Sequence, residues 1–167
     1  PALWFSHLWE NHLFDPSPKY FTIFFALPYS WVDSKEILHS LINNLDFMVN
    51  NNIRVIVKRH PTMKLEYVEN MIGSNHSDIF SLVDESFIGC LSKSNMVISG
   101  MSGAVIESIV FGIPVVLLRN RRGITFNPIP KEIPQGIWNM CDSSDEIIGL
   151  IQKYSSISDE KLQGYKE

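Results

Sequence analysis

The sequence predicts an α/β fold built on a doubly wound parallel sheet of about six strands. Short apolar runs alternate about six times along the chain with helical patterns, and this alternation is typical of parallel sheets with right-handed crossovers. The length of 167 residues and the 45% hydrophobic content are sufficient for one buried core. In such a sheet the expected strand order is 3-2-1-4-5-6, and ligands bind where the first and fourth strands part.

The first predicted strand and helix come from two different apolar patterns. Residues 20–27 form an apolar run rich in aromatic side chains, which is typical of a strand buried on both faces. The segment after it has apolar residues at a 3.6-residue period, as on one face of a helix. We expect Asp33 or Ser34 to cap this helix, with Glu36 in a capping box. The asparagines at 50–52 end it.

The middle of the chain supplies two more strands and two helices. Residues 53–57 and 79–83 are short apolar runs, and we interpret them as the second and third strands. Between them, residues 62–72 have apolar side chains at helical spacing, and Gly73 is a typical helix stop. Residues 87–91 form a short helix before the fourth strand.

The last elements continue the alternation. The final helix is amphipathic, and we expect Asp142 or Ser143 to cap it. The elements before it are, in order, a strand at 96–99, a helix at 103–111, and strands at 113–118 and 136–141. The sequence therefore predicts a Rossmann-like sheet.

Two flanking segments differ from the alternating region, which spans residues 20–154. Residues 1–19 are rich in aromatic side chains and end in two prolines, which predicts a lead-in segment or an interdomain linker. Residues 155–167 form a polar tail. Because the chain begins with Pro1 rather than Met, we expect it to be part of a longer protein.

The charge balance and the cysteines exclude several classes of protein. Fourteen Lys and Arg against 18 Asp and Glu give a net charge of -4, which argues against a nucleic-acid partner. Cys90 and Cys141 form no CxxC pair, and we expect both to be reduced and buried. No apolar run is long enough to span a bilayer, and no secretory signal is visible. We therefore expect a cytoplasmic protein.

Candidate ligand-binding residues follow the first two strands at their carboxyl ends. Tyr29 and Ser30 come after the first strand as candidate ligand contacts. Lys58 and His60 come after the second strand, and the proline that follows holds His60 extended. With Arg59 they supply three potential cations, which suit an anionic phosphate. Because Lys58 and Arg59 point to opposite sides of an extended chain, we expect at most one of them to reach the ligand.

The loop at residues 99–103 follows the fourth strand and begins a helix. Gly100 and Gly103 allow a ligand to approach the backbone, and a helix start offers unpaired amides. Ser99 and Ser102 add hydroxyl donors. These features suit a phosphate, although an ordinary strand-to-helix turn has the same composition.

Two further charged residues lie near the same edge of the sheet. Glu107 is four residues past Gly103 on an almost wholly apolar helix, where a carboxylate needs partners such as ribose hydroxyls, or else faces water. Arg119 follows the fifth strand and could contact phosphate, a partner domain or solvent. The histidines show no metal-ligand spacing. Neither a GxGxxG after the first strand nor a GxxxxGK[ST] is present, which excludes a dinucleotide fingerprint and a P-loop hydrolase.

The order of these motifs resembles a known family. Lys58-x-His60-Pro61, followed about forty residues later by the segment 99–115 with Glu-x4-Gly-x-Pro-Val, is similar to the C-terminal, donor-binding domain of GT-B-fold glycosyltransferases. The KxHP element resembles bacterial capsule and surface-polysaccharide enzymes that use CMP-Kdo, CMP-sialic acid or CDP-glycerol. The Glu-x4-Gly-x-Pro-Val part is also similar to UDP-N-acetylglucosamine 2-epimerases, but Met101 stands where these tend to have a second glycine.

The resemblance implies a role for each matching residue. His60 is the catalytic residue and, with Ser99, Ser102 and Gly103, contacts the donor's phosphates, while Glu107 holds the ribose. None of these contacts needs a cofactor or a metal. The reasoning from the residues themselves adds Lys58 and Gly100 as further phosphate contacts.

These roles imply the donor-nucleotide-binding half of a bacterial glycosyltransferase, which transfers a sugar from a CMP-, CDP- or UDP-linked donor to a surface glycan. The acceptor would bind through a missing N-terminal domain, and the fragment alone would be inactive. The full-length protein could associate peripherally with the inner face of the cell membrane. A 2-epimerase-like enzyme is the first alternative, and a non-catalytic α/β domain that binds a protein is the second.

Overall fold

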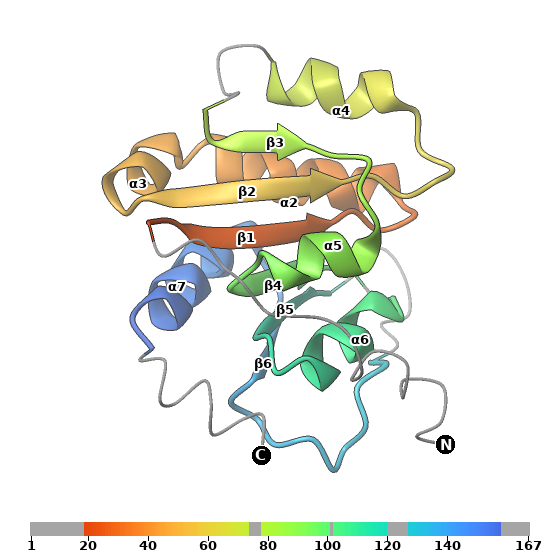
Figure 1. Ribbon diagram of the computed structural model, residues 1–167, viewed down its shortest axis with the longest axis vertical. Helices are drawn as coiled ribbons and strands as arrows, with labels where there is room; N and C mark the ends of the chain where they lie inside the picture. Colours follow the sequence, from red (N-terminus) through yellow and green to blue (C-terminus); the bar gives the residue numbers. More distant parts are fainter. Residues whose placement is uncertain (1–18, 74–77, 101, 120–126, 158–167) are drawn as a thin grey trace.

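The structure, a computed structural model, describes residues 19–73, 78–100, 102–119 and 127–157 (Figure 1). Its six strands form one sheet in the order β3-β2-β1-β4-β5-β6, and every neighbouring pair is parallel. This order is the predicted one, so the Rossmann-like α/β class is confirmed. Residues 1–18 of the predicted lead-in segment, Met101 and most of the polar tail lie outside the described residues.

The elements alternate along the chain as the sequence predicted. The strands are β1 (Phe21–Ala26), β2 (Ile53–Lys58), β3 (Phe80–Leu82), β4 (Met96–Ser99), β5 (Val115–Leu118) and β6 (Trp138–Cys141). The helices are α2 (Trp31–Ile42), α3 (Leu45–Asn50), α4 (Leu65–Ile72), α5 (Phe87–Ser92), α6 (Ala104–Val110) and α7 (Ser144–Ser155).

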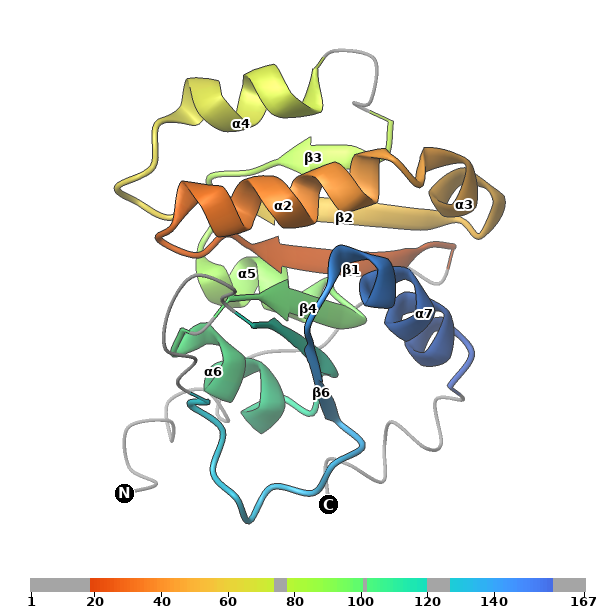
Figure 2. The ribbon, with the colours of Figure 1, turned by 180° about the vertical axis from the view of Figure 1, so that it is seen from behind.

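Helices cover both faces of the sheet, and each face has its own apolar cluster. Helices α2, α3 and α7 lie on one face and α5 and α6 on the other (Figures 1 and 2). Alternate residues of β1 point into the two clusters: Phe25 packs with α2 and α7, and Phe24 packs with α5 and α6. Burial on both faces explains why the strands read as nearly continuous apolar runs.

The helix after β1 begins earlier than the sequence predicted. Ser30 is extended and its hydroxyl accepts a hydrogen bond from the Asp33 amide, so Ser30 is the N-cap. The prediction that Asp33 or Ser34 caps the helix is wrong. The earlier start places Trp31 in the first turn, where its ring lies 5.6 Å from that of Tyr67 on α4. Packing between helices thus favours this cap over the local capping-box pattern.

Other boundaries also differ from the predictions, and several of them have a visible cause or a clear shift. The single helix predicted up to residues 50–52 is divided into α2 and α3, because the Asn44 side chain donates to the Ser40 carbonyl and competes with the helical pattern. Helix α4 begins at Leu65 rather than residue 62, since residues 60–63 form a turn closed by the Met63 amide and the His60 carbonyl. Strands β5 and β6 each begin two residues later than predicted, at Val115 and Trp138.

Candidate functional site

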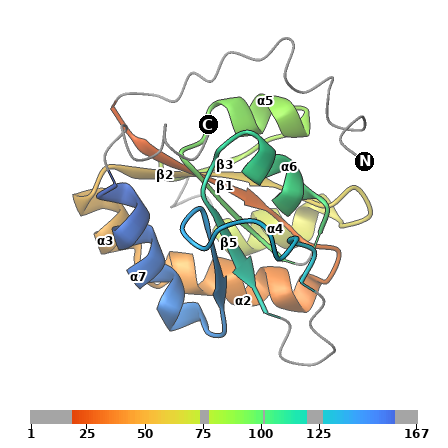
Figure 3. The same ribbon diagram turned by 90° about the horizontal axis from the view of Figure 1, so that it is seen from below.

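Three strand ends are level at the carboxyl edge of the sheet. Ala26 of β1 pairs in register with Lys58 of β2 on one side and with Ser99 of β4 on the other. The chain leaves β1 toward α2 on one face and leaves β4 toward α6 on the opposite face (Figure 3). The loops after β1, β2 and β4 therefore diverge around one point, the predicted ligand position for this topology.

A cavity of about 480 Å³ opens at this point. It is lined by Ala26, Leu27, Pro28, Tyr29, Lys58, Arg59, His60, Pro61, Phe87, Ser102 and Ala104. Four of the predicted site residues thus meet in one cavity: Tyr29, Lys58, His60 and Ser102. No Asp or Glu belongs to the described residues that line it. An apolar wall with a few basic and hydroxyl groups suits an organic anion.

His60 is half-buried and is held from two sides. Its Nδ1 lies 2.8 Å from the hydroxyl oxygen of Thr62, and the Thr62 amide donates to the same nitrogen over 3.3 Å. The Tyr29 ring meets the imidazole edge to face, with ring centres 5.5 Å apart. Tyr29 is itself 75% exposed, so it forms the outer rim of the cavity beside His60.

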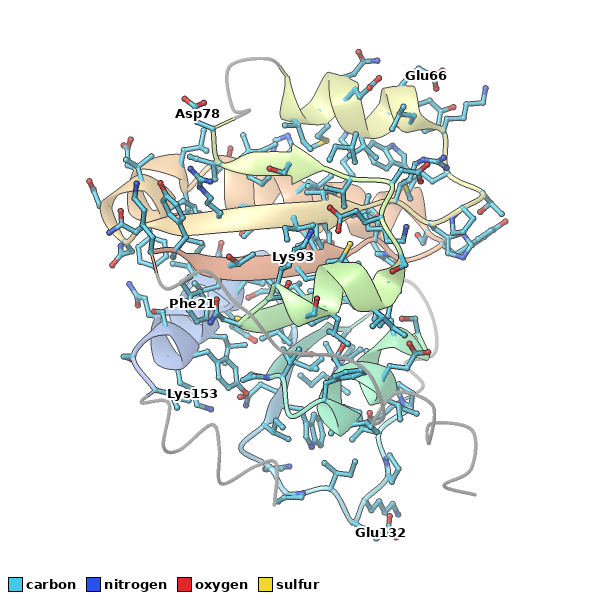
Figure 4. The ribbon with its side chains drawn as sticks, viewed as in Figure 1. Phe21, Glu66, Asp78, Lys93, Glu132 and Lys153 are labelled. Carbon is cyan, nitrogen blue, oxygen red and sulfur yellow. The ribbon has the colours of Figure 1, made fainter. Side chains whose placement is uncertain are left out.

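Lys58 and Arg59 use their charges differently. The Lys58 ammonium donates to the Glu85 carbonyl oxygen over 2.6 Å, which holds the side chain across the gap between β2 and the loop after β3. Arg59 donates to the carbonyl oxygens of Pro61 and Met63, so its guanidinium braces its own loop. Both residues line the cavity. The Glu85 carboxylate pairs with Lys93, which is labelled in Figure 4.

The loop after β4 presents one hydroxyl to the cavity and buries the other. Ser99 is buried and donates to the Ala26 carbonyl oxygen, and its hydroxyl lies 3.3 Å from that of Ser102. Ser102 lines the cavity, whereas Ser99 does not. Ser99 therefore ties β4 to β1 and supports Ser102 from behind.

The two glycines of this loop have different surroundings. A Cβ on Gly100 would lie 2.7 Å from Cβ of Pro28, so only glycine fits against the loop after β1. A Cβ on Gly103 would meet no atom within 4 Å, and Gly103 has helical backbone angles as the N-cap of α6. Gly100 is therefore needed for packing, and the open side of Gly103 is where a ligand could approach the backbone.

The remaining predicted residues lie outside this cavity lining. Ser30 caps α2. Glu107 is half-buried on α6, where every residue is buried or half-buried. The Arg119 guanidinium pairs with Asp142 over 2.7 Å at the ends of β5 and β6. Ligand contacts by Ser30, Glu107 and Arg119 stay predictions that the described contacts do not support.

Sequence reasoning missed several residues of the site. Pro28 and Phe87 form apolar walls, and Thr62 holds the imidazole. The hydroxyl two residues after His60 is a local signal that could have identified Thr62. The roles of Pro28 and Phe87 depend on contacts between distant loops.

A second cavity of about 500 Å³ lies between α2 and α7 and is lined by residues that include Lys35, His39 and Asp145.

Other features of the described residues bear on the earlier predictions. Cys90 and Cys141 are free and buried, as predicted, and burial raises the pKa of both thiols, that of Cys141 to about 11. Within the described ranges no cluster of three or more His, Cys, Asp and Glu could hold a metal. None of the helices in that part of the chain is long and apolar enough to cross a bilayer.

Comparisons with known proteins identify the fold. No protein-family model matches the chain, and no curated protein matches its sequence. The UDP-GlcNAc 2-epimerase of Neisseria meningitidis, solved with UDP-GlcNAc, is 16% identical with a TM-score of 0.61 over 83% of this chain and 39% of its own. The wall teichoic acid polymerase TagF, soaked with CDPG, is 12% identical with a TM-score of 0.59, and the match covers 91% of this chain and 37% of TagF. The C-terminal domain of the glycosyl transferase LpcC of Francisella tularensis is 15% identical with a TM-score of 0.58, and the match covers 92% of this chain and 89% of that domain.

The chain has the fold of one half of a GT-B protein. It spans about two fifths of the epimerase and of TagF, but most of the isolated LpcC domain. At these identities the likeness extends to the fold alone. Glycosyltransferases and UDP-GlcNAc 2-epimerases both occur among the structures that share it.

Proposed function

We propose that this chain is the donor-binding half of a glycosyltransferase and that a nucleotide-sugar binds in the cavity between the loops after β1, β2 and β4. The observation that carries the proposal is the composition of that cavity. Lys58 and His60 from the end of β2 meet Ser102 from the loop after β4, and no carboxylate lies among the described lining residues. Such a set of donors favours a phosphate group over a neutral or cationic ligand.

The proposed chemistry is displacement of the nucleotide from the sugar. As the bond between the sugar and the phosphate oxygen breaks, negative charge develops on the phosphate. Hydrogen-bond donors that are already held in place stabilise this charge more than they stabilise the ground state. Lys58 is held by the Glu85 carbonyl and His60 by Thr62, so neither side chain needs to reorganise when the charge appears.

Several parts of the proposal come from the resemblance rather than from the described contacts. We propose that Ser99, Gly100 and Gly103 form the rest of the phosphate loop and that Glu107 holds the ribose. The acceptor glycan would bind through an N-terminal domain, and the protein would act in the cytoplasm at the inner face of the cell membrane in surface-glycan synthesis. The donor would carry CMP, CDP or UDP.

A calorimetric titration with CMP, CDP, UDP and GDP tests the proposal. At least one nucleotide should bind, and His60→Ala should weaken that binding by roughly 1.5 to 3 kcal/mol, the range for a charged hydrogen bond. His39→Ala is the matched control, because His39 is exposed on α2 beside the other cavity. Failure of every nucleotide to bind, or an equal loss in both variants, would contradict the proposal. The first of these results would favour the protein-binding alternative.

A 2-epimerase-like activity is the second candidate, because the fold is shared with a UDP-GlcNAc 2-epimerase. The two candidates differ in what the complete protein would need. An epimerase converts its UDP-sugar without an acceptor, whereas a transferase requires one. Incubating the full-length protein with UDP-GlcNAc alone and following the sugar's configuration by NMR separates them.

A further inference from the structure

Thr62 contacts the imidazole of His60 in a way that fixes the position of its proton. The backbone amide of Thr62 donates to Nδ1 over 3.3 Å, and the Thr62 hydroxyl oxygen lies 2.8 Å from the same atom. An amide can only donate, so Nδ1 must offer a lone pair to it. The hydroxyl can then donate as well, which adds a second hydrogen bond to the unprotonated nitrogen.

A neutral imidazole carries its proton on one nitrogen at a time. With Nδ1 as an acceptor, the proton lies on Nε2. Among the described residues, no hydrogen bond is formed to Nε2, and His60 lines the cavity. The Nε2–H donor therefore has no partner among the described residues, and it belongs to a side chain that lines the cavity with Lys58 and Ser102.

We propose that Thr62 is a positioning residue that holds His60 as the Nε2–H tautomer, so that His60 acts as a hydrogen-bond donor to phosphate and not as a base. This inference rests on the proposed function, in which the cavity takes the donor's phosphates. In that role the neutral ring stabilises charge on the leaving phosphate, and no proton is removed from an acceptor by Nε2.

The loop around Thr62 is braced independently of any ligand. Arg59 donates to the carbonyl oxygens of Pro61 and Met63, and the Met63 amide donates to the His60 carbonyl. Pro61 fixes one backbone angle between His60 and Thr62. These contacts hold the turn that brings the Thr62 hydroxyl back to the ring, so Thr62 can be changed without removing the supports of the loop.

The tautomer is measured directly by NMR of ¹⁵N-labelled histidine at pH 8, where an ordinary imidazole is neutral. The inference expects the wild-type His60 signals to show an unprotonated Nδ1 and a protonated Nε2, with or without nucleotide. Thr62→Val removes the hydroxyl and keeps the amide, and it should move the Nδ1 signal toward that of a ring without the second hydrogen bond. Thr62→Ser should restore the wild-type signals. A proton on Nδ1 in the wild type, or identical spectra for all three proteins, would overturn the inference.

Nucleotide affinity provides the second measurement. Thr62→Val should weaken binding of a nucleoside diphosphate roughly 2- to 12-fold, the effect of one neutral hydrogen bond, and Thr62→Ser should recover it. Loss of affinity in both variants with unchanged His60 signals would mean that Thr62 acts only on loop structure, which also overturns the inference. If the wild type binds no nucleotide, the proposed function fails while the tautomer measurement still decides the role of Thr62.

Discussion

The contact between Gly100 and Pro28 makes the loop after β4 sensitive to a single methyl group. In Gly100→Ala the new Cβ would lie 2.7 Å from Cβ and 3.1 Å from Cγ of Pro28, and separations under 3.0 Å are essentially never seen for real Cβ atoms. Pro28 is buried, and its ring cannot rotate away as a flexible side chain would. Either the loop after β1 or the loop after β4 must move. Overpacking of this kind costs roughly 1 to 3 kcal/mol.

The matched control for this substitution is Gly103→Ala. No heavy atom lies within 4 Å of a Cβ at Gly103, and its backbone angles are helical. We therefore expect its unfolding free energy to change by no more than about 0.5 kcal/mol. Urea unfolding followed by circular dichroism measures both variants, and Gly100→Ala should also lower Tm by roughly 2 to 12 °C. Equal stabilities for the two variants would refute the packing role given to Gly100.

Three further predictions concern residues around the edge of the sheet. If Glu107 holds the ribose, Glu107→Gln should weaken nucleotide binding by roughly 1.5 to 3 kcal/mol. Removing both ribose hydroxyls from the nucleotide should then weaken its binding to the variant only a little further. If calorimetry shows the same further loss of affinity in the variant and the wild type, Glu107 does not contact the ribose. Because the exposed Arg119–Asp142 pair lies outside the cavity lining, Arg119→Ala should change stability by about 0 to 1 kcal/mol and leave nucleotide affinity unchanged; a tenfold weaker affinity would contradict this. Burial raises the pKa of Cys141 from 9.0 to about 11, so the folded state keeps a proton that the unfolded state loses. The raised pKa stabilises the folded state by about 2 to 3 kcal/mol below pH 9, and this stabilisation is lost as the pH rises from 9 to 11. Urea titrations should show this loss of stability in the wild type and not in Cys141→Ser. The same loss in both proteins would contradict the assignment.

The strand order could be predicted from the sequence because it follows from chain connectivity. Alternating strands and helices with right-handed crossovers leave few topologies, and the observed order placed the ends of β1, β2 and β4 side by side. That arrangement alone was enough to bring Tyr29, Lys58, His60 and Ser102 into one cavity. Residues at strand ends are therefore predictable when the topology is.

The errors arose where a distant contact outweighs a local pattern. Asp33 and Glu36 match the sequence pattern of a capping box, but in the structure Ser30 caps the helix and Trp31 packs on Tyr67. The close approach of Gly100 to Pro28 from the loop after β1 was missed as well. Neither contact leaves a periodic signal in the sequence, since each joins residues that meet only in the folded chain.

The most direct test of the central claim is to locate the bound nucleotide on the protein. Backbone amide chemical shifts can be followed by NMR while CMP, CDP, UDP and GDP are titrated into the ¹⁵N-labelled protein. The account predicts that at least one nucleotide shifts the amides of Tyr29, Lys58, His60 and Ser102 most strongly and leaves the cavity between α2 and α7, at Lys35, His39 and Asp145, unchanged. The largest shifts at this second cavity, or no shifts with any of the nucleotides, would contradict it.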